Sequence, residues 1–404
     1  MNPATLYATP NALAPHYSQF RVAERLLLTG HSHQAWPDVG FEAQADAWRD
    51  AAELVDDKWG RAFERAGEVR AGFARLLGEP EAAIALAPNT HELVVRLLSA
   101  LPLGTRPRIV TTDGEFHTVR RQCDRLAEEG IEIVRVAEEP LESVSERVAR
   151  AVTDRTALVI MSAVFFDSGR IARGLGAVAA ACRRHGAVFL VDVYHALNVV
   201  PFAVAEQGLS DVYIVGGGYK YCQLGEGNCF LRLPPDCDLR PVITGWFSEF
   251  TALASREREG RTAYGTGGDR FAGATYDPAS HYRAARVFRY FGEQSLTPAL
   301  LREVSQHQIG VLAERFDALG LDPATVRRDT AVPLAEIGGF LALRAPRANE
   351  LAQALHERGV LTDARGDVLR FGPAPYLSDR QLTDAMTALR EAVHAPVPGR
   401  GAHP

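Results

Sequence analysis

Short apolar runs alternate with amphipathic stretches along the middle of the chain, from about residue 80 to residue 217. The apolar runs are rich in β-branched residues, a pattern typical of parallel strands buried on both faces. They fall at residues 108–112, 131–137, 156–166, 187–196 and 211–217. Amphipathic segments at 140–153 and 174–186 lie between them and predict helices. Strand–helix–strand alternation implies right-handed crossovers, so we predict a doubly wound α/β domain with a mostly parallel sheet.

The periodicity changes near residue 297, where Thr297 and Pro298 predict the start of a helix that Gly320 ends. Beyond it the pattern predicts strands at 338–345 and 368–373, a helix from about 348, and a helix that begins with the capping box at 378–381. We therefore predict an N-terminal segment (1–40), a large α/β domain (41–290), a small C-terminal α+β domain (291–394) and a flexible tail (395–404).

The composition is that of an ordinary globular protein, with 47% hydrophobic and 23% charged residues and a formal net charge of −6. Arginines are interleaved with acids, as at 255–261, whereas a nucleic-acid site requires uncompensated basic clusters. The N-terminus lacks the basic and then apolar pattern of a secretory signal, and no apolar run reaches the ~18 residues of a membrane span. We expect neither nucleic acid nor a membrane as a partner.

The five cysteines are an odd number without a CxxC pair, which is typical of reduced thiols in a cytosolic protein. We therefore expect a cytoplasmic location. His31 and His33 are the only closely spaced candidate metal ligands that we single out, and no third ligand lies near them in the sequence. No metal site is predicted.

Lys220 lies between two tyrosines and glycine-rich segments, directly after the strand predicted at 211–217. The preceding strand delivers Asp192 to the same sheet edge, and open α/β sheets bind ligands beyond the carboxyl ends of their strands. A buried lysine loses its charge readily and becomes an amine nucleophile that forms imines. A carboxylate beside such a lysine suggests pyridoxal 5'-phosphate, because the carboxylate keeps the pyridine nitrogen protonated. The flanking glycines fit a flat cofactor lying against the backbone.

Each of these residues taken alone has a simpler explanation. A lysine at a strand end is commonly a surface residue with its amine in water, and an aspartate there commonly forms a turn. Their occurrence together on successive strands favours the cofactor site. No GxxxxGK[ST] motif is present, so the glycines do not indicate a nucleotide phosphate loop.

The segments "FFDSGRI", "FLVDVYHALNVVPF" and "GLSDVYIVGGGYKYCQLGEG" contain an Asp-x-x-His followed by a Tyr-Lys-Tyr. This combination resembles the kynureninase family, which belongs to the fold-type-I pyridoxal-phosphate enzymes of the class V aminotransferase superfamily. The likeness covers most of the chain, with further motifs at 26–38, 245–247, 270–275 and 366–376. The first combination is fairly specific to kynureninase-like proteins, whereas the last motif is shared by the whole superfamily.

The resemblance implies a role for each matched residue. Lys220 would carry the cofactor as an imine and then move protons, and Asp192 would pair with the pyridine nitrogen. His195 would lie beside the ring or its phenolic oxygen, and Tyr219 would bind the phosphate and relay a proton.

The turn that opens the predicted helix after residue 89 offers a phosphate site, because a helix N-terminus presents free N–H groups. Asn89, Thr90 and the backbone of His91 are the candidates, and ordinary helix capping explains the same residues. An aromatic side chain should stack on the cofactor ring. Matching to kynureninases favours Phe116, matching to cysteine desulfurases favours His117, and the sequence leaves the two open.

Arg370 lies between apolar residues just before a Gly-Pro turn, and its guanidinium offers the two-pronged contact that an α-carboxylate requires. The resemblance makes Arg370 the arginine that binds the substrate carboxylate, and a buried structural ion pair is the alternative. Trp246 and Thr275 resemble residues that reach the phosphate from the neighbouring subunit. They imply a homodimer with shared active sites, although Trp246 taken alone fits a core aromatic.

The match fails at two places. The family's opening motif is acidic-Gly-Asn-Ser-Leu-Gly, where this chain has "TGHSH" with His31 and His33, and Val119 stands where the family has an aspartate. Both places touch the substrate or the cofactor's oxygen, so the departures leave the exact substrate open.

The favoured function is hydrolysis of the Cβ–Cγ bond of kynurenine or 3-hydroxykynurenine, which gives alanine and an anthranilate in tryptophan catabolism or a specialised pathway. His31, His33 or Tyr219 would act on the hydrated ketone. The first alternative is another class V reaction on an amino acid: an aminotransferase, an epimerase or a β-lyase. Cysteine desulfurase is disfavoured because no cysteine follows Cys237. A nicotinamide enzyme, suggested by "GLGAVA" at 174–179, and an inactive binding protein are the remaining alternatives.

Overall fold

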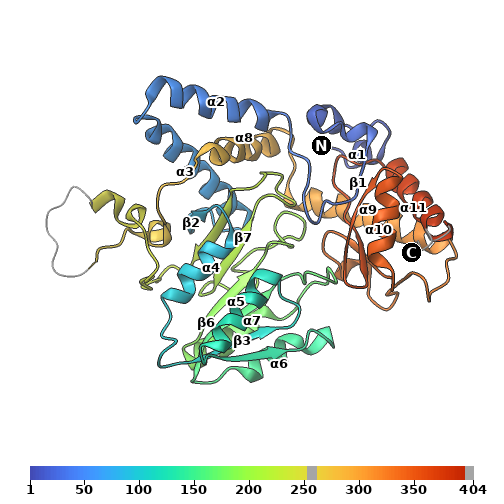
Figure 1. Ribbon diagram of the computed structural model, residues 1–404. Helices are drawn as coiled ribbons and strands as arrows, with labels where there is room; N and C mark the ends of the chain where they lie inside the picture. Colours follow the sequence, from blue (N-terminus) through green and yellow to red (C-terminus); the bar gives the residue numbers. More distant parts are fainter. Residues whose placement is uncertain (253–261, 396–404) are drawn as a thin grey trace, which may run out of the picture.

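The computed structural model describes residues 1–252 and 262–395, and it divides into a large α/β part and a smaller C-terminal part (Figure 1). Seven strands form the large sheet in the order β2-β8-β7-β6-β5-β3-β4. All neighbouring strands are parallel except at β8, which runs antiparallel to both β2 and β7. The strands are β2 (Ala83–Ala87), β3 (Arg108–Thr112), β4 (Glu132–Val136), β5 (Thr156–Ser162), β6 (Val188–Asp192), β7 (Tyr213–Gly217) and β8 (Cys229–Leu233).

The sheet is buried on both faces because its central strands are apolar except at their ends. All of β5 is buried, and its successive side chains enter two separate hydrophobic clusters, with Val159 and Met161 in one and Leu158 and Ile160 in the other. The helices that cover the two faces are α3 (Lys58–Leu76), α4 (Thr90–Ser99), α5 (His117–Glu128), α6 (Val144–Ala151) and α7 (Leu175–His185). The doubly wound architecture predicted from the apolar runs is confirmed.

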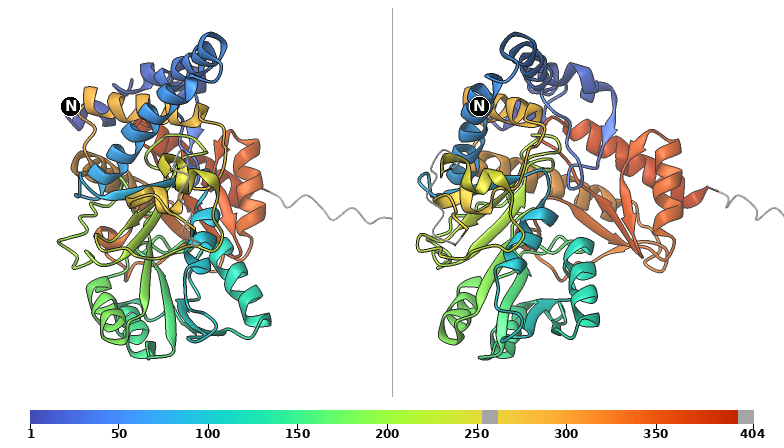
Figure 2. Two further views of the ribbon diagram at one scale, coloured as in Figure 1. Left: turned by 90° about the vertical axis from the view of Figure 1, so that its left-hand side faces the viewer. Right: turned by 60° about the vertical axis from the view of Figure 1, so that its left-hand side comes forward.

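Two further long helices extend the large part. α2 (Val39–Leu54) packs on α8 (Ala279–Glu293), and both contact α3, so that the three helices lie together beside the β2 edge of the sheet (Figures 1 and 2). Short 3₁₀ segments connect the elements at Ala14–Phe20, Val22–Glu24, Leu141–Ser143, Trp246–Ala252, Gly267–Phe271 and Leu334–Glu336.

The C-terminal part is a four-stranded antiparallel sheet covered by helices, as the change of periodicity predicts. The strand order is β12-β13-β10-β9. Its elements are α9 (Pro298–Ala318), β9 (Arg327–Arg328), β10 (Leu341–Arg344), α10 (Ala348–Glu357), β12 (Asp363–Arg365), β13 (Val368–Phe371) and α11 (Asp379–His394). Thr297 caps α9, and Ser378 and Gln381 form the predicted capping box of α11.

The N-terminal segment packs on the C-terminal part although the two are far apart in the sequence (Figure 1). After α1 (Ala4–Tyr7), strand β1 (Leu26–Leu27) pairs in parallel with β11 (Val360–Leu361), and Thr29 continues the pairing with Gly372. This pairing places residues 29–36 beside the C-terminal strands and close to the carboxyl end of the large sheet.

Some predicted boundaries differ from the observed ones. The strand predicted over 156–166 ends at Ser162, because the chain turns back and Val164 bridges Ile171. Strands β2 and β8 were not predicted from the sequence. Gly174 is the N-cap of α7 and lies well beyond the end of β5, so the strand-to-glycine turn of a nicotinamide fingerprint is missing there. Of the predicted tail, only residue 395 lies within the described ranges.

Three further observations concern the cysteines, membrane-spanning helices and metal ligands. All five cysteines are free thiols. Within residues 1–252 and 262–395, no helix is long and apolar enough to cross a membrane, and no group of three potential metal ligands occurs.

Candidate active site

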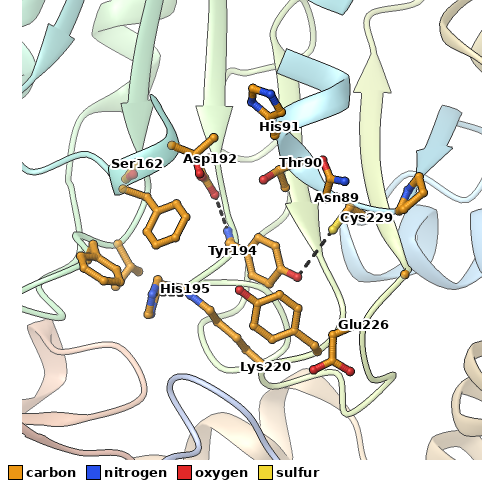
Figure 3. Close-up of a pocket in the computed structure, with 17 residues that line it drawn as sticks. Asn89, Thr90, His91, Ser162, Asp192, Tyr194, His195, Lys220, Glu226 and Cys229 are labelled. Atoms are coloured by element: carbon orange, nitrogen blue, oxygen red, sulfur yellow. Dashed lines mark hydrogen bonds between the residues drawn. The ribbon is translucent and has the colours of Figure 1, made fainter. Parts of the chain in front are cut away.

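A cavity of about 330 Å³ opens at the carboxyl ends of β5, β6 and β7 (Figure 3). Ser162 ends β5 and Asp192 ends β6, and these two residues are partners in the strand register. Lys220 follows the end of β7 by three residues. The walls are formed by Pro88, Asn89, Thr90, His91, Phe116, Thr118, Ser162, Val164, Phe166, Asp192, Tyr194, His195, Tyr219, Lys220, Glu226, Gly227 and Cys229.

Lys220 is the buried amine of this cavity, with only 5% of the residue exposed. Its Nζ donates a hydrogen bond to Nε2 of His195, at 2.5 Å. Burial lowers the pKa of Lys220 to about 7, while the charge of Asp192 opposes and that of Arg370 assists this shift. A lysine with this pKa is largely uncharged above neutral pH, which is the state that attacks an aldehyde.

Asp192 and His195 flank the amine. The Oδ1 atom of Asp192 accepts a hydrogen bond from the backbone N–H of Tyr194 at 2.8 Å, and burial raises the pKa of Asp192 against the opposing charge of Lys220. Burial also lowers the pKa of His195 well below its usual value, and Nδ1 of His195 has no partner among the described residues. An unpartnered buried polar atom beside a buried amine indicates that a polar ligand completes the site.

Glu115 is a second buried carboxyl group, which the sequence reading missed. Its carboxylate accepts hydrogen bonds from the backbone N–H and Oγ of Ser162, at 3.0 and 2.6 Å, and from Oγ1 of Thr112 at 2.7 Å. Burial nevertheless raises the pKa of Glu115 to about 7, and the charge of Asp192 adds to the shift. Glu115 follows β3, and the pairing of β3 with β5 and of β5 with β6 brings it near Asp192, so no local sequence signal marks it.

The N-terminus of α4 lines the opposite end of the cavity through Asn89, Thr90 and His91. Asn89 is the N-cap, and its side chain accepts from the backbone N–H of Glu92 at 2.9 Å. Both explanations of this turn therefore coexist: it is a capped helix start, and it faces the cavity with the positive end of a helix dipole.

The two aromatic candidates lie differently. Phe116 lines the cavity with its ring centroid 6.0 Å from Nζ of Lys220. His117 is outside the lining, and its Nδ1 accepts a hydrogen bond from Arg120 at 2.9 Å. The geometry therefore favours Phe116 as the residue that stacks on a bound ring.

Tyr219, His33 and Glu226 form the mouth of the cavity. The ring of His33 stacks on that of Tyr219 at a centroid distance of 4.7 Å, and Nε2 of His33 lies 3.5 Å from Oε1 of Glu226. His33 and Glu226 are both exposed. Glu226 was not singled out from the sequence, because a lone exposed acid carries no signal until the fold places it beside a cavity.

The glycines before Lys220 have a structural reason that differs from the prediction. A Cβ at Gly217 would collide with the hydroxyl of Tyr194 and the thiol of Cys229, and a Cβ at Gly218 would collide with Leu224. These glycines make room for neighbouring protein side chains. Of the glycines around Lys220, Gly227 lines the cavity.

Arg370 and His31 lie behind the cavity wall, among the residues that do not line it. Nε and Nη2 of Arg370 form a two-pronged ion pair with Asp363, at 2.9 and 2.6 Å, and Nε2 of His31 lies 2.8 Å from Oδ1 of Asp363. This is the buried ion pair that the sequence left as the alternative for Arg370. Burial lowers the pKa of His31 to about 4, so His31 is neutral at physiological pH.

Trp246 and Thr275 do not line the cavity of their own chain. Nε1 of Trp246 donates to Oγ1 of Thr275 at 3.2 Å, and 46% of Trp246 is exposed. Thr275 lines a second cavity of about 710 Å³, which shares Pro88, Glu226 and Gly227 with the first. Their predicted action in a partner subunit's site stays a prediction.

Comparison with protein families gives two matches on separate parts of the chain. The model "Aminotransferase class-V" matches residues 55–242, and the model "Kynureninase C-terminal domain" matches residues 301–389. The chain is thus similar to class V aminotransferases over residues 55–242, and this similarity indicates pyridoxal phosphate as its cofactor.

Similar proteins span most of the chain at low identity. An uncharacterized aminotransferase YcbU of Bacillus subtilis is 23% identical over 81% of this chain and 84% of its own length. A kynureninase of Xanthomonas campestris is 26% identical over 76% and 75%, and an isopenicillin N epimerase of Streptomyces clavuligerus is 27% identical over 80% and 84%.

The fold of this chain is also seen in solved structures. A C-DES variant with glycine covalently linked to its PLP cofactor superposes with a TM-score of 0.80 at 17% identity, covering 93% of this chain and 98% of that one. The complex of the cystine C-S lyase C-DES with cysteine persulfide gives a TM-score of 0.77 at 18% identity, covering 92% and 98%.

The residues of the cavity fit the class V cofactor. The buried amine of Lys220 is suited to the cofactor's aldehyde, and the carboxylate of Asp192 to its ring nitrogen. The unpartnered Nδ1 of His195 provides a polar contact, and the N-terminus of α4 suits a phosphate. All four groups belong to residues that line the cavity.

Proposed function

We propose that this class V enzyme hydrolyses the Cβ–Cγ bond of kynurenine or 3-hydroxykynurenine, releasing alanine and an anthranilate. The observation that carries the proposal is the match of residues 301–389 to the kynureninase C-terminal domain, which spans β13 with Arg370. The proposal is also supported by four side chains that lie together around one cavity: Asp192, His195, Tyr219 and Lys220.

Bound pyridoxal phosphate supplies an aldehyde for the substrate amine and a ring that accepts the electron pair released at Cα. The chain's own groups then handle protons. Lys220, uncharged above about pH 7, is placed to take the Cα proton, and its hydrogen bond to His195 orients the amine. Asp192 would keep the ring nitrogen of the bound cofactor protonated, and Phe116 would cover a face of its ring, since both residues line the cavity.

The hydrolytic step adds one water across the Cβ–Cγ bond. Hydroxide adds to the γ-carbonyl carbon and becomes part of the anthranilate carboxylate, while Cβ receives a proton and becomes the methyl group of alanine. Tyr219 and His33, which stack at the mouth, are the groups placed to exchange protons with the hydrated ketone. His31 is buried and bonded to Asp363, so the predicted acid–base role is not assigned to His31.

The test uses the cofactor-loaded protein with kynurenine and 3-hydroxykynurenine. We expect anthranilate fluorescence and alanine to appear in equal amounts, and Lys220→Ala to abolish both. Saturable binding without either product would refute the proposed reaction.

A second candidate is another class V reaction on an amino acid, such as transamination, epimerisation or β-elimination. It is favoured by the similarity to the aminotransferase and the epimerase, which spans a larger share of the chain than the kynureninase similarity. Incubation with amino acids, with and without a keto acid, distinguishes it, because transamination requires the keto acid and none of the three reactions cleaves kynurenine to alanine and an anthranilate.

The site is also proposed to be shared in a homodimer, to which each chain contributes Trp246 and Thr275. Trp246 and its neighbours Val242, Ile243 and Phe250 are exposed apolar residues near the second cavity, which supports a partner at this surface.

A further inference from the structure

Arg370 and Asp363 form a cross-strand pair within the C-terminal sheet. Asp363 on β12 is the register partner of Arg370 on β13, so both side chains lie on the same face of the sheet. The contact is two-pronged and nearly dry, with 1% of the Arg370 side chain and 17% of the Asp363 side chain exposed. The charge of Arg370 is therefore already neutralised by a carboxylate of the chain itself.

Arg370 makes a third hydrogen bond, in which its Nη1 donates to the backbone oxygen of Phe166 at 2.9 Å. The guanidinium carbon lies 4.7 Å from the centre of the Phe166 ring, and Phe166 forms part of the cavity wall. The ring of Phe166 therefore separates Arg370 from the cavity. Three of its five N–H donors are occupied before any substrate arrives.

Asp363 has other partners besides Arg370. Nε2 of His31 lies 2.8 Å from one carboxylate oxygen, and the guanidinium of Arg365 lies 3.5 Å from the other. These contacts matter because a buried charge that loses its only partner is strongly destabilised. Asp363 can release Arg370 and still keep two donors.

We propose that Asp363 is the residue that sets the affinity for the substrate carboxylate, because it competes with that carboxylate for Arg370. The substrate carboxylate replaces Asp363 as the acceptor of hydrogen bonds from Arg370. Asp363 meanwhile keeps its contacts with His31 and Arg365. Simple addition would place two carboxylates against one buried cation, where the two negative charges repel each other. The inference rests on the proposed function in one respect, that Arg370 binds the substrate's α-carboxylate.

The exchange is tested by removing the competing charge without changing the side-chain shape. Cofactor-loaded wild type and Asp363→Asn are titrated with L-alanine and with L-alaninamide, which lacks the carboxylate. The change in the visible spectrum of the cofactor gives each dissociation constant. We expect Asp363→Asn to bind L-alanine about tenfold more tightly and L-alaninamide within about twofold of wild type.

Asp367→Asn is the matched control. Asp367 lies in the turn of the same hairpin and pairs with Arg344 at the surface, so the variant makes the same charge change away from Arg370. Its two dissociation constants should equal those of wild type. The proposal would be overturned if Asp363→Asn left the ratio of the L-alanine and L-alaninamide dissociation constants unchanged. It would also be overturned if the variant bound L-alanine more weakly, or if L-alanine did not change the visible spectrum. Weaker L-alanine binding alone would show that Asp363 orients Arg370.

A crystal structure of the cofactor-loaded wild type with L-alanine provides a test that needs no variant. The proposal requires at least one of the two Asp363–Arg370 hydrogen bonds to be replaced by the carboxylate of L-alanine, and two intact bonds would overturn it. Neither experiment depends on kynurenine cleavage. A failure of the kynurenine assay with a successful exchange test would therefore reject the reaction alone.

Discussion

At the scale of single residues, burial determines the chemistry of the site more than residue type does. Lys220 and Glu115 both have a pKa near 7, although their ordinary values differ widely, because desolvation opposes the charged form of each. At Asp363, hydrogen bonds outweigh the effect of burial on the pKa. Burial alone would raise the pKa of Asp363, but hydrogen bonds from His31 and Arg370 hold it below the usual value.

The pKa of Lys220 predicts how fast the cofactor-free protein takes up pyridoxal phosphate. With a pKa of about 7, the uncharged fraction of the amine rises about tenfold between pH 6 and pH 8 and then levels off. The rate of cofactor incorporation, followed by absorbance after rapid mixing, should show this profile. A rate that keeps rising towards pH 10 would mean that Lys220 has an ordinary pKa. Lys220→Ala, as a control, should show no incorporation.

Glu115 predicts a pH dependence of stability. Its pKa is raised from 4.5 to about 7 in the folded protein, so its contribution to stability is fully present below pH 4.5 and is lost as the pH rises towards 7. In Glu115→Gln this loss disappears. The free energy of unfolding of the variant relative to wild type should increase by about 2 kcal/mol between pH 5 and pH 8.

Urea unfolding of the cofactor-free protein measures this difference. Glu138→Gln provides a comparison at a second carboxyl group whose pKa is raised by burial. A constant difference between Glu115→Gln and wild type across this pH range would contradict the raised pKa of Glu115.

At the scale of elements, the ends of strands and helices carry the site. The carboxyl ends of β5 and β6 present Ser162 and Asp192 side by side, and the N-terminus of α4 faces them. The tight packing of Tyr194 and Leu224 against Gly217 and Gly218 fixes the turn that carries Lys220. Backbone geometry at element ends therefore positions the reactive groups.

The N-terminus of α4 is expected to bind the cofactor's phosphate. Thr90→Val removes a hydroxyl donor there and should weaken pyridoxal phosphate by about tenfold, while leaving the affinity for unphosphorylated pyridoxal unchanged. Thr118→Val, elsewhere on the cavity wall, is the matched control. Fluorescence titration with both ligands measures the effect. An equal loss for pyridoxal would indicate a general disturbance of the cavity.

At the scale of the whole molecule, segments that are distant in sequence meet at the site. The pairing of β1 with β11 brings His31 and His33 to the C-terminal strands, and Arg370 reaches back to the oxygen of Phe166 in the large part. The exposed Trp246 and its hydrogen-bond partner Thr275 lie outside the lining of the cavity that contains Lys220.

A shared site predicts complementation between two inactive variants. Lys220→Ala lacks the amine and Thr275→Ala weakens the contribution to the partner's site, so neither homodimer should have full activity. In an equimolar mixture after subunit exchange, half of the dimers combine both variants, and each of these has one intact site. Activity should recover to about a quarter of the wild-type value. No recovery in exchanged dimers, verified by mass, would show that each chain builds its site alone.

The sequence by itself determined the layers of the fold and the chemistry of the cofactor. The apolar runs after residue 108 are long and β-branched enough to require burial on both faces, and the strand ends are local features, so Asp192 and Lys220 could be found directly. His195 was found through the resemblance to the kynureninase family. Strand β8 was missed because the direction of a strand depends on its neighbours. Boundaries such as the end of β5 at Ser162 were missed because the turn after it is set by the bridge from Val164 to Ile171.

Only the tertiary structure decided which charges meet. Glu115 comes to bond Ser162, at the edge of the site, through the pairing of β3 with β5, and Glu226 joins the cavity lining through its place at the mouth. Asp363 engages Arg370 because β12 and β13 pair in one register. The energy of a charge depends on its burial and on its nearest opposite charge, and both are properties of the folded chain. A short segment of sequence shows neither the burial of a charge nor its nearest opposite charge. By contrast, a few residues are enough to show a hydrophobic periodicity.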